Sequence, residues 1–502
     1  MKNVLEYLEN TAKKYPEKTA VIDINGECTY DELLRKSKAA GSEIVKYTGA
    51  GKPVVCFMSK SIQTLECFFG IAYAGCFYTL VDPDFPKERV QQILSVLDPS
   101  VIITDKSQTE NIEKLGEDRK VIFAEDFTDD IDEDALASVR RQAVDTDPLY
   151  CNFTSGSTGV PKGVLVGHKS VIDFIDVFTE TFGIDDTDII GNQAPFDFDV
   201  SVKDIYSAIK TGATLVIIPK EYFMFPVKVI DMLEDNHVTT LIWAVSALCM
   251  LIRLHGFKYK VPSSIKRIMF SGEVMPIKQF NKLKKVYPDI TYVNLYGPTE
   301  ITCNCAYYVV DREFENEDRM PMGIPFDNEK ILLLDENDKE VEDGVQGEVC
   351  VCGTALALGY YNNPENTAKS FTLNPLNKCY PEMMYRTGDL AYKEGGQLYF
   401  AGRKDFQIKH MGHRIELEEI EAVLGGVEGV SHGCCAYDEK RNKVVAFYKG
   451  DAEVDFIKES MKIAVPDYMV PNVFKQLNEI PLTKNGKTDR KLLFAMYKEG
   501  TI

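Results

Sequence analysis

The residues that could do chemistry begin with a loop of small polar side chains, FTSGSTGVPKGV, at Phe153–Val164. Short hydroxyl side chains, glycines that let backbone N–H groups approach a ligand, and Lys162 can together cradle an anion such as phosphate. The common phosphate loop carries Ser or Thr after its lysine, whereas Gly163 stands there in this chain. The pattern therefore predicts a phosphate-binding loop of a different kind, with a plain Gly/Ser-rich hairpin as the alternative.

Two further stretches place polar side chains beside predicted turns. In NLYGPTE a strand runs into Gly-Pro, which gathers Tyr296, Thr299 and Glu300. An aromatic ring can stack on a base, a hydroxyl can hold a phosphate oxygen, and a carboxylate can hold Mg²⁺. In YRTGDL, Asp389 follows a glycine in a predicted turn and can accept from both hydroxyls of a ribose. Each stretch alone is explained as well or better by an ordinary turn.

Three charged residues lie late in the chain. Arg403 and Asp405 fall at a predicted domain junction, and the turn residues Asn485–Gly486 hold Lys487 out on a loop. In isolation these are ordinary solvated charges. Lys487 could contact phosphate only if a small C-terminal domain folds over a large one.

The elements that must position these residues alternate between β-rich runs and helical patterns over the first 400 residues. This rhythm predicts an α/β fold with parallel-rich sheets flanked by helices, and ligands at the carboxyl ends of the strands. After about Gly347, short glycine-punctuated runs indicate a small antiparallel or barrel-like subdomain. We expect a large domain over residues 1–404 and a small mobile α+β domain over 405–502. The expected strands are Pro53–Met58, Ser100–Asp105, Lys120–Glu125, Thr214–Pro219, Thr239–Val245 and Ile265–Gly272, and the expected helices include Val227–Asn236, Ile277–Val286 and Ile415–Leu424.

Composition excludes several classes of protein. The 502 residues carry a formal charge of −20, which disfavours a nucleic-acid binder because phosphate contacts need a basic face. The most apolar run, Cys67–Val81, is shorter than the ~20 residues that cross a bilayer. The 13 cysteines are odd in number, scattered and without C-x-x-C spacing. We therefore expect a cytoplasmic protein with reduced thiols, no structural zinc and no membrane insertion.

Taken together, these stretches resemble the adenylate-forming enzyme superfamily, which includes peptide-synthetase adenylation domains, acyl-CoA ligases and luciferases. The resemblance covers nearly the whole chain, including GIAYAGCFYTLVDPDFPKERVQQIL, GEVCVCGTALALGYYNNPE and GRKDFQIKHMGHRIELEEIE. Within the superfamily the chain looks most like D-alanine–carrier protein ligases and stand-alone peptide-synthetase adenylation domains. The resemblance implies activation of a carboxylate as an acyl-AMP with release of pyrophosphate, then transfer to a phosphopantetheine thiol.

The same resemblance implies roles for the motif residues, with ATP and Mg²⁺ required. Lys487, Thr299 and Glu300 would be catalytic, Glu300 would hold Mg²⁺, and Asp405 would be the hinge of the mobile domain. The loop would hold the β and γ phosphates, Thr299 the α-phosphate, Tyr296 the adenine and Asp389 the ribose. The implied ATP-binding residues are Thr154, Ser155, Gly156, Ser157, Thr158, Gly159, Lys162, Asn294, Tyr296, Gly297, Asp389 and Arg403.

For the acid that is activated, the resemblance implies an α-amino acid whose ammonium pairs with Asp199. The alternative is that Asp199 caps a helix start, with Ser201 sharing that work. D-alanine ligases usually carry Cys in place of Ser271 and Met in place of Lys203, so D-alanine and an acidic or polar amino acid both stay open. Lys203 would need a partner, which could be a substrate carboxylate, Asp204 or solvent. The implied pocket is Asp199, Val200, Lys203, Ser246, Met269, Ser271, Gly272, Leu295, Cys303 and Asn304.

The acceptor is expected to be a separate, acidic, phosphopantetheinylated carrier protein, because no carrier domain follows residue 502. The local basic residues Lys282, Lys284 and Lys285 could meet it, or could form a solvated helix face. One alternative function is an acyl-CoA ligase for a non-amino acid, against which Asp199 argues. Another is an inactive nucleotide-binding relic, against which the presence of Lys487 and Glu300 argues.

Overall fold

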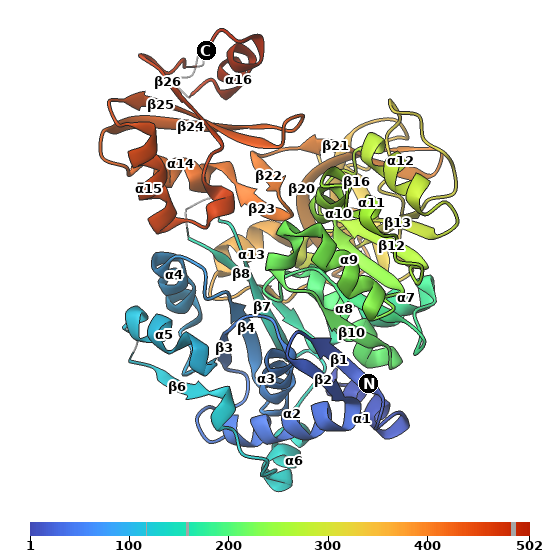
Figure 1. Cartoon of the computed structure of the whole chain (residues 1–502). Coiled ribbons are helices and arrows are strands. Elements are labelled where there is room, and N and C mark those ends of the chain that lie inside the picture. The colour runs from blue at the N-terminus through green and yellow to red at the C-terminus, as the bar shows by residue number, and fades with distance from the viewer. Residues whose placement is uncertain (117, 157–159, 483–487) are drawn as a thin grey trace. The chain divides into compact units, whose positions relative to one another are not determined.

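The computed structural model (Figure 1) describes residues 1–116, 118–156, 160–482 and 488–502. The described chain divides into two compact units. Unit 1 comprises Met1–Pro83, Leu97–Asn152 and Val164–Lys404, and unit 2 comprises Asp84–Val96, Phe153–Gly163 and Asp405–Ile502. Unit 2 thus combines the C-terminal residues with two earlier segments, one of which is the predicted phosphate loop. The predicted domains 1–404 and 405–502 stay a prediction.

One sheet of unit 1 carries five of the predicted site residues on two neighbouring strands: Met269, Ser271, Asn294, Leu295 and Tyr296. Its core strands are parallel and buried on both faces, which explains apolar runs such as TLIWA. The predicted parallel-rich sheet is therefore confirmed. The order is β15 (Ile324–Pro325), β14 (Ala306–Val309), β13 (Thr291–Tyr296), β12 (Arg267–Ser271), β11 (Thr240–Ala244), β9 (Ile189–Asn192), β10 (Thr214–Ile217), β1 (Thr19–Asp23) and β2 (Gly26–Thr29).

A second sheet of unit 1 shares a hydrophobic core with the first, in which Phe68 and Tyr78 stack at 3.9 Å between ring centroids. The stacked pair joins helix and strand, which fixes the sheet against its covering layer. The order is β18 (Gly359–Tyr360), β8 (Lys162–Gly167), β7 (Pro148–Thr154), β4 (Phe77–Val81), β3 (Pro53–Phe57), β5 (Val101–Thr104) and β6 (Lys120–Phe123).

Helices cover these sheets with their apolar faces. The start of a helix is also specified locally: α2 begins with a capping box in which Thr29 and Glu32 satisfy each other's backbone N–H groups. The helices of unit 1 are α1 (Leu5–Lys14), α2 (Tyr30–Ile44), α3 (Ile62–Tyr73), α5 (Thr109–Leu115), α6 (Glu133–Gln142), α7 (His168–Phe182), α8 (Val200–Thr211), α9 (Pro226–Asp235), α10 (Val245–Arg253), α11 (Gly256–Tyr259), α12 (Ile277–Val286) and α13 (Pro364–Ser370).

The predicted antiparallel subdomain after Gly347 is confirmed. It runs in the order β16 (Glu329–Leu334), β17 (Gly347–Gly353), β20 (Met383–Glu394) and β19 (Phe371–Leu373), with β21 (Gln397–Arg403) also paired to β20. The expectation that Asp389 lies in a turn is wrong, because it lies inside the long strand β20. Gly388 before it has φ +72°, and the pairing with β21 shifts between Leu390 and Ala391. A positive φ and a bulge let the strand bend without ending.

Unit 2 has small sheets and helices of its own. The predicted helix at Ile415–Leu424 begins later, at Leu417, because His413–Glu416 pairs as a strand with Gln407–His410. The elements are α4 (Lys87–Leu97), β22 (Gln407–His410), β23 (His413–Glu416), α14 (Leu417–Gly425), β24 (Val430–Asp438), β25 (Lys443–Gly450), α15 (Val454–Ala464), β26 (Val473–Gln476) and α16 (Arg490–Glu499).

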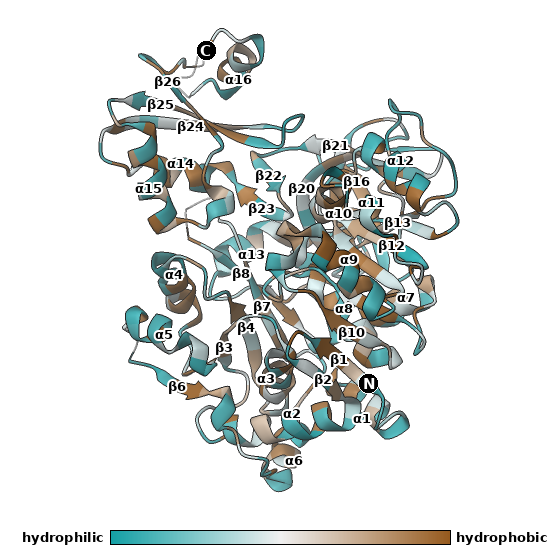
Figure 2. Ribbon diagram, viewed as in Figure 1, coloured by the Kyte–Doolittle hydropathy of each residue, from teal (hydrophilic) through white to brown (hydrophobic). Residues whose placement is uncertain are grey.

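The pattern of hydropathy follows this architecture, with hydrophobic residues on interior strands such as β4 and β10 (Figure 2). All 13 cysteines are free thiols, and only Cys379 is exposed. Among the residues that the structure describes, no helix combines the length and apolar character needed to span a bilayer. Within the same residues, no cluster of three or more His, Cys, Asp or Glu side chains is arranged to hold a metal ion.

Candidate active site

The predicted site residues of unit 1 follow the carboxyl ends of parallel strands. The strands β9, β11, β12 and β13 end together at Asn192, Ala244, Ser271 and Tyr296. Ser246 is the second residue of α10, which starts directly after β11, and Gly272 follows β12 with φ +96°. The carboxyl edge of a parallel sheet is where such folds bind ligands, because the loops that leave it converge.

Lys203 joins three of the predicted pocket residues. It lies on α8 with 0% of its surface exposed, and its Nζ donates to Asn304 Oδ1 at 2.7 Å and to Ser271 Oγ at 3.3 Å. The structure therefore identifies the partner that sequence reasoning left open. Asp204 does not fill that role: its Oδ2 accepts from Asn192 Nδ2 at 2.7 Å, and burial raises the pKa of its carboxyl group to about 7.

Asp199 lies one helical turn before Lys203 and is 6% exposed. It occupies the position that precedes α8, but its carboxylate makes no capping hydrogen bond to the helix. Ser201 does not cap the helix either, since its hydroxyl donates to the carbonyl of Phe198 at 2.7 Å. The capping alternative for Asp199 is thus not supported. Asp199 also acts electrostatically on Tyr150: the pKa of the Tyr150 phenol is raised mainly by burial and next by the charge of Asp199.

The other predicted pocket residues are mostly buried around this cluster. Ser246 and Gly272 are half-buried, and the rest are closed to solvent: Val200, Met269, Leu295, Cys303 and Asn304. Burial raises the pKa of the Cys303 thiol to about 12, and Lys203 acts against that rise while Asp199 adds to it. Lys203, Cys303 and Asp199 are therefore electrostatic neighbours.

Gly297 allows the chain to return beside the end of β13. A Cβ there would lie 2.4 Å from Asn304 Cα, so only glycine fits. The return is held by Cys305 N, which donates to Tyr296 O at 2.8 Å. Thr302 adopts φ +68°, which is rare for a β-branched residue and is held by its hydroxyl bond to Ala355 O at 2.7 Å. This strained turn presents Asn304 to Lys203.

The predicted ribose residue Asp389 is held from both sides. Tyr296 donates its hydroxyl to Asp389 Oδ2 at 2.5 Å, and Arg403 donates to Asp389 Oδ1 at 2.5 Å. The structure thus brings these three predicted residues together. Each carboxylate oxygen has a second lone pair, so the geometry fits a ligand hydroxyl at Asp389 as well. Burial, then Asp389, raises the pKa of Tyr296 well above its usual value.

Glu300, the predicted magnesium residue, lies in the 3₁₀ turn η4 (Thr299–Ile301) with 0% of its surface exposed. Its Oε1 accepts from Tyr360 OH at 2.7 Å. A single oriented carboxylate fits Mg²⁺, which takes one or two protein carboxylates and completes its shell with phosphates and water. Thr299 is buried in the same turn, and Asn294 is used structurally, donating to Pro321 O at 2.7 Å.

The predicted phosphate loop is described only in part. Ser155 donates to Arg414 O at 2.8 Å and accepts from Glu416 N at 3.0 Å, and Gly156 N donates to a carboxylate oxygen of Glu419 at 3.1 Å. Lys162 Nζ lies 3.6 Å from Glu416 Oε1. Within unit 2 the described part of the loop therefore contacts the carboxylates of Glu416 and Glu419.

The remaining predicted site residues are Thr154, Asp405 and those that the structure does not describe. The Thr154 hydroxyl is buried with no hydrogen-bond partner, which leaves a polar atom for a ligand. Asp405 begins the C-terminal part of unit 2 and accepts from Gln407 N at 3.2 Å. Ser157, Thr158, Gly159 and Lys487 lie outside the described residues.

Sequence reasoning missed several residues that hold the site. Tyr360 bonds Glu300, Tyr150 donates to Thr302 O at 3.2 Å, and Thr302 carries the strained backbone. Tyr360 stands in the stretch LGYYNNPE, but nothing in that stretch indicates the partner of its hydroxyl. These contacts join residues far apart in the chain, and only the fold brings them together.

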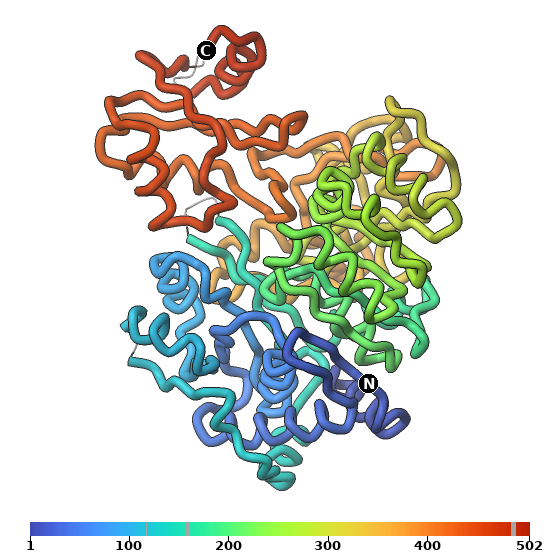
Figure 3. The backbone as a smooth tube through the Cα atoms, in the orientation of Figure 1, coloured from blue at the N-terminus to red at the C-terminus, as the bar shows by residue number. Residues whose placement is uncertain are grey.

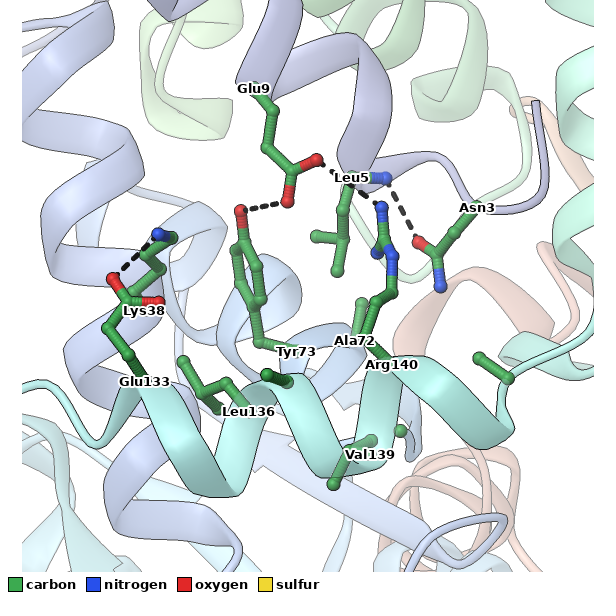
Figure 4. A pocket seen from close by; sticks show the side chains of 13 residues that line it. Asn3, Leu5, Glu9, Lys38, Ala72, Tyr73, Glu133, Leu136, Val139 and Arg140 are labelled. Atoms are coloured by element: carbon green, nitrogen blue, oxygen red, sulfur yellow. Dashed lines mark hydrogen bonds and ion pairs between the residues drawn. The ribbon is translucent and has the colours of Figure 1, made fainter.

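A separate hollow of about 110 Å³ lies among α1, α2, α3 and α6 (Figure 4). None of the predicted site residues lines it. Several of its polar side chains are paired with one another: Tyr73 OH donates to Glu9 at 2.9 Å, and Lys38 Nζ lies 2.8 Å from Glu133. The hollow therefore contributes to the structure of unit 1 rather than to the site.

Known proteins similar to this chain include zwittermicin A synthase ZmaJ of Bacillus cereus, 32% identical over 98% of this chain and 94% of the relative. A D-alanine–D-alanyl carrier protein ligase of Bacillus cytotoxicus is 31% identical over 98% of this chain and 99% of the relative. Bacitracin synthase 1 of Bacillus licheniformis is 32% identical, but the chain spans only 9% of its length.

Solved structures share the fold at lower identity. The amide bond synthetase McbA of Marinactinospora thermotolerans superposes with a TM-score of 0.86 at 19% identity, covering 99% of this chain and 100% of the other. A peptide-synthetase protein with adenylation and PCP domains, holo-PA1221, gives a TM-score of 0.85 at 22% identity, covering 98% and 84%. These likenesses show the fold.

The family description "AMP-binding enzyme" matches residues 8–361 of this chain. That segment contains the strand ends, the strained turn and the phosphate loop described above, and it is more than half of the sequence. The chain therefore belongs to the AMP-binding enzyme family and is an adenylate-forming enzyme.

Proposed function

We infer that this enzyme activates an α-amino acid with ATP and transfers it to the thiol of a phosphopantetheinylated carrier protein. In the first step a carboxylate oxygen of the amino acid forms a bond to the α-phosphorus of ATP, and the bond to the β-phosphate oxygen breaks. The products are aminoacyl-AMP and pyrophosphate. In the second step the thiol sulfur attacks the acyl carbon, AMP leaves with the bonding electrons, and the thiol proton is released.

The observation that carries the choice of an amino acid is the placement of Asp199. Its carboxylate is buried beside Tyr150, Cys303 and the Lys203 cluster and does not cap α8. A carboxylate at such a buried position attracts a cationic group, because a nearby opposite charge stabilises its charged form. An α-ammonium bound there would pair with this carboxylate and place the reacting carboxylate of the substrate at the carboxyl edge of the sheet.

The chain's own residues would prepare the ATP side before any bond forms. Tyr296 and Arg403 fix the orientation of Asp389 for the ribose hydroxyls. Thr154 and the rest of the loop would hold the β and γ phosphates, and Thr299 the α-phosphate. Such fixed donors lower the barrier by positioning and by stabilising charge that develops in the transition state.

Glu300, oriented by Tyr360, would hold Mg²⁺. When bound, the ion would neutralise phosphate charge. Lys487 would stabilise the charge shared by the attacking carboxylate and the α-phosphate. Asp405 would be the hinge of the domain that brings Lys487 to the reaction and removes it afterwards.

The carrier acceptor is supported by relatives that match most of their length to this chain, among them a D-alanine–D-alanyl carrier protein ligase. The negative charge of the whole chain, −20, means that an acidic carrier would need a local basic surface. Lys282, Lys284 and Lys285 on or beside the end of α12 would offer one.

The test is amino-acid-dependent ATP–pyrophosphate exchange, with both enantiomers of the common amino acids and with fatty and aromatic acids. We expect exchange with at least one amino acid, and we expect Asp199→Asn to reduce kcat/KM for it at least 100-fold while ATP still binds. The isosteric change removes the charge and keeps the shape. Exchange with non-amino acids alone would instead identify an acyl-CoA ligase.

Lys487→Ala should lower exchange by about 10³-fold, since it removes a charge that acts in the transition state. Binding of ATP, measured by calorimetry, should be nearly unchanged. Lys484→Ala, three residues earlier, is the matched control and should keep its activity. Equal behaviour of the two variants would contradict the assigned role of Lys487.

A further inference from the structure

We propose that Lys203 forms the floor of the amino-acid pocket and restricts it to small side chains, those of glycine, alanine and serine. This inference rests on the proposed function and deepens it. It comes from the hydrogen bonds of Lys203 and from its position on α8 relative to Asp199.

The ammonium of Lys203 is held by the protein itself. A lysine has three N–H donors, and two neighbours accept from Lys203 Nζ: Asn304 Oδ1 at 2.7 Å and Ser271 Oγ at 3.3 Å. Both are neutral oxygens. A substrate carboxylate would have to compete with these two acceptors for an ammonium that they already hold.

These partners also stretch the side chain across the predicted pocket. Lys203 starts from α8, Ser271 ends β12, and Asn304 lies on the turn that returns beside β13. A lysine that reaches both of them fills the space between the helix and the strand ends with its methylene stem. Because its relative exposure is 0%, the stem is enclosed as well.

The spacing along α8 limits how long a substrate side chain can be. Asp199 has helical backbone angles, φ −59° and ψ −24°, so Asp199 and Lys203 stand at i and i+4 on one helix face. Cβ atoms at that spacing lie about 5–6 Å apart. A substrate whose ammonium is held by Asp199 therefore meets Lys203 within one helical turn.

The strained turn at Thr302 explains why the floor is rigid. Its hydroxyl donates to Ala355 O, and its own carbonyl accepts from Tyr150. The segment around Asn304 packs directly on the backbone of Gly297, where a Cβ would lie 2.4 Å from Asn304 Cα. The acceptor that holds Lys203 is consequently fixed by the fold.

A panel on the wild-type enzyme is the first arm of the test and needs no substitution. Exchange kinetics are measured with glycine, both enantiomers of alanine and serine, aspartate, glutamate, leucine and methionine. We expect kcat/KM for one of the small amino acids to exceed that for every larger one by at least 100-fold. Preference for aspartate or glutamate would show that Lys203 pairs with a substrate carboxylate and would overturn the proposal.

The second arm changes the floor. Lys203→Ala should raise kcat/KM for methionine or leucine at least tenfold, whereas Lys203→Met, of similar length, should keep the preference for small substrates. Lys210→Met on the same helix, where Lys210 bonds Thr179 at 2.8 Å, is the matched control and should resemble wild type. If Lys203→Ala gains no larger substrate although thermal unfolding shows it folded, Lys203 is not the floor.

These outcomes separate this inference from the proposed function. A large or acidic amino acid as the wild-type substrate contradicts the small pocket and leaves amino-acid activation intact. Exchange with no amino acid at all contradicts both.

Discussion

At the scale of the residue, the orientation of Glu300 depends on one phenol. Tyr360 donates to Glu300 Oε1 at 2.7 Å, both side chains are buried, and Tyr385 lies 3.5 Å from Tyr360 between their hydroxyl oxygens. A hydrogen bond to a ligating carboxylate fixes the oxygen that faces the metal, and losing such a partner typically weakens metal binding 10–100-fold.

Tyr360→Phe should therefore raise the Mg²⁺ concentration needed for half-maximal exchange by about tenfold. The binding of Mn²⁺ together with ATP, followed by electron paramagnetic resonance, should weaken in parallel. Tyr361→Phe is the matched control, because the Tyr361 ring packs against Phe77 at 5.3 Å and the ring is kept. An unchanged metal requirement in Tyr360→Phe would show that the bond only supports the fold.

At the scale of the element, α4 and the phosphate loop are tied to α14 in unit 2. Arg89 of α4 pairs with Glu419 of α14 at 2.7 Å, with side chains 5% and 2% exposed, and Gly156 N donates to the same carboxylate. Burial raises the pKa of Glu419, and Arg89 opposes that rise. The pair thus joins three segments that are far apart in sequence.

Arg89→Met should destabilise unit 2 by about 3–5 kcal/mol, because it leaves a buried carboxylate without its cation. The double variant Arg89→Met with Glu419→Gln should recover much of that loss. Hydrogen exchange of α14 amides measures the effect locally. Lys369→Ala, in the exposed pair with Glu365, is the control and should change little. A double variant as unstable as Arg89→Met would contradict the argument from the unpaired charge.

At the scale of the whole molecule, a buried histidine fastens the N-terminal segment. His168 begins α7 and is 2% exposed; its Nδ1 accepts from Val4 N at 3.4 Å, and its Nε2 lies 3.4 Å from Asn3 Nδ2. The N-terminal segment is the dark blue end of the backbone trace in Figure 3. Burial lowers the pKa of His168 to about 3, with Arg140 adding to the effect. The native state therefore holds this imidazole neutral.

This histidine gives the stability of unit 1 a pH dependence. The unfolded pKa of histidine is about 6.5, so between pH 6.5 and about 3 the unfolded state binds more protons and unfolding becomes easier as pH falls. Glu329 has the opposite effect on stability, because burial raises its pKa to about 8. The native state then binds the extra proton, and unfolding becomes harder as pH falls from about 8. The difference between His168→Gln and wild type isolates the histidine.

The free energy of unfolding can be measured in urea by the fluorescence of Trp243, which lies in unit 1. Below pH 6, the free energy of unfolding of wild type should fall with each pH unit by up to about 1.4 kcal/mol more than that of His168→Gln. His237→Gln, at an exposed position, is the control. Parallel pH profiles for wild type and His168→Gln would rule out the buried histidine as the cause.

The sequence by itself determined most of the elements and predicted which residues form the ATP side. Helix α12 was predicted with its observed bounds, and each predicted strand overlaps an observed one, because apolar periodicity and turn residues are local properties. Asp199, Glu300 and Asp389 could be proposed because their motifs are short and contiguous. The Asp389 turn was wrong because the bulge that continues β20 depends on its partner β21.

Only the tertiary structure decided which groups meet. Lys203 could have faced a substrate, Asp204 or solvent, and the fold pairs it with Asn304 and Ser271, roughly 100 and 68 residues away in sequence. Parallel strands bring their carboxyl ends to one edge however distant they are along the chain. A glycine and a strained threonine then set how closely the returning segment approaches. No local pattern encodes such a distance, since it depends on the packing of every element between the two residues.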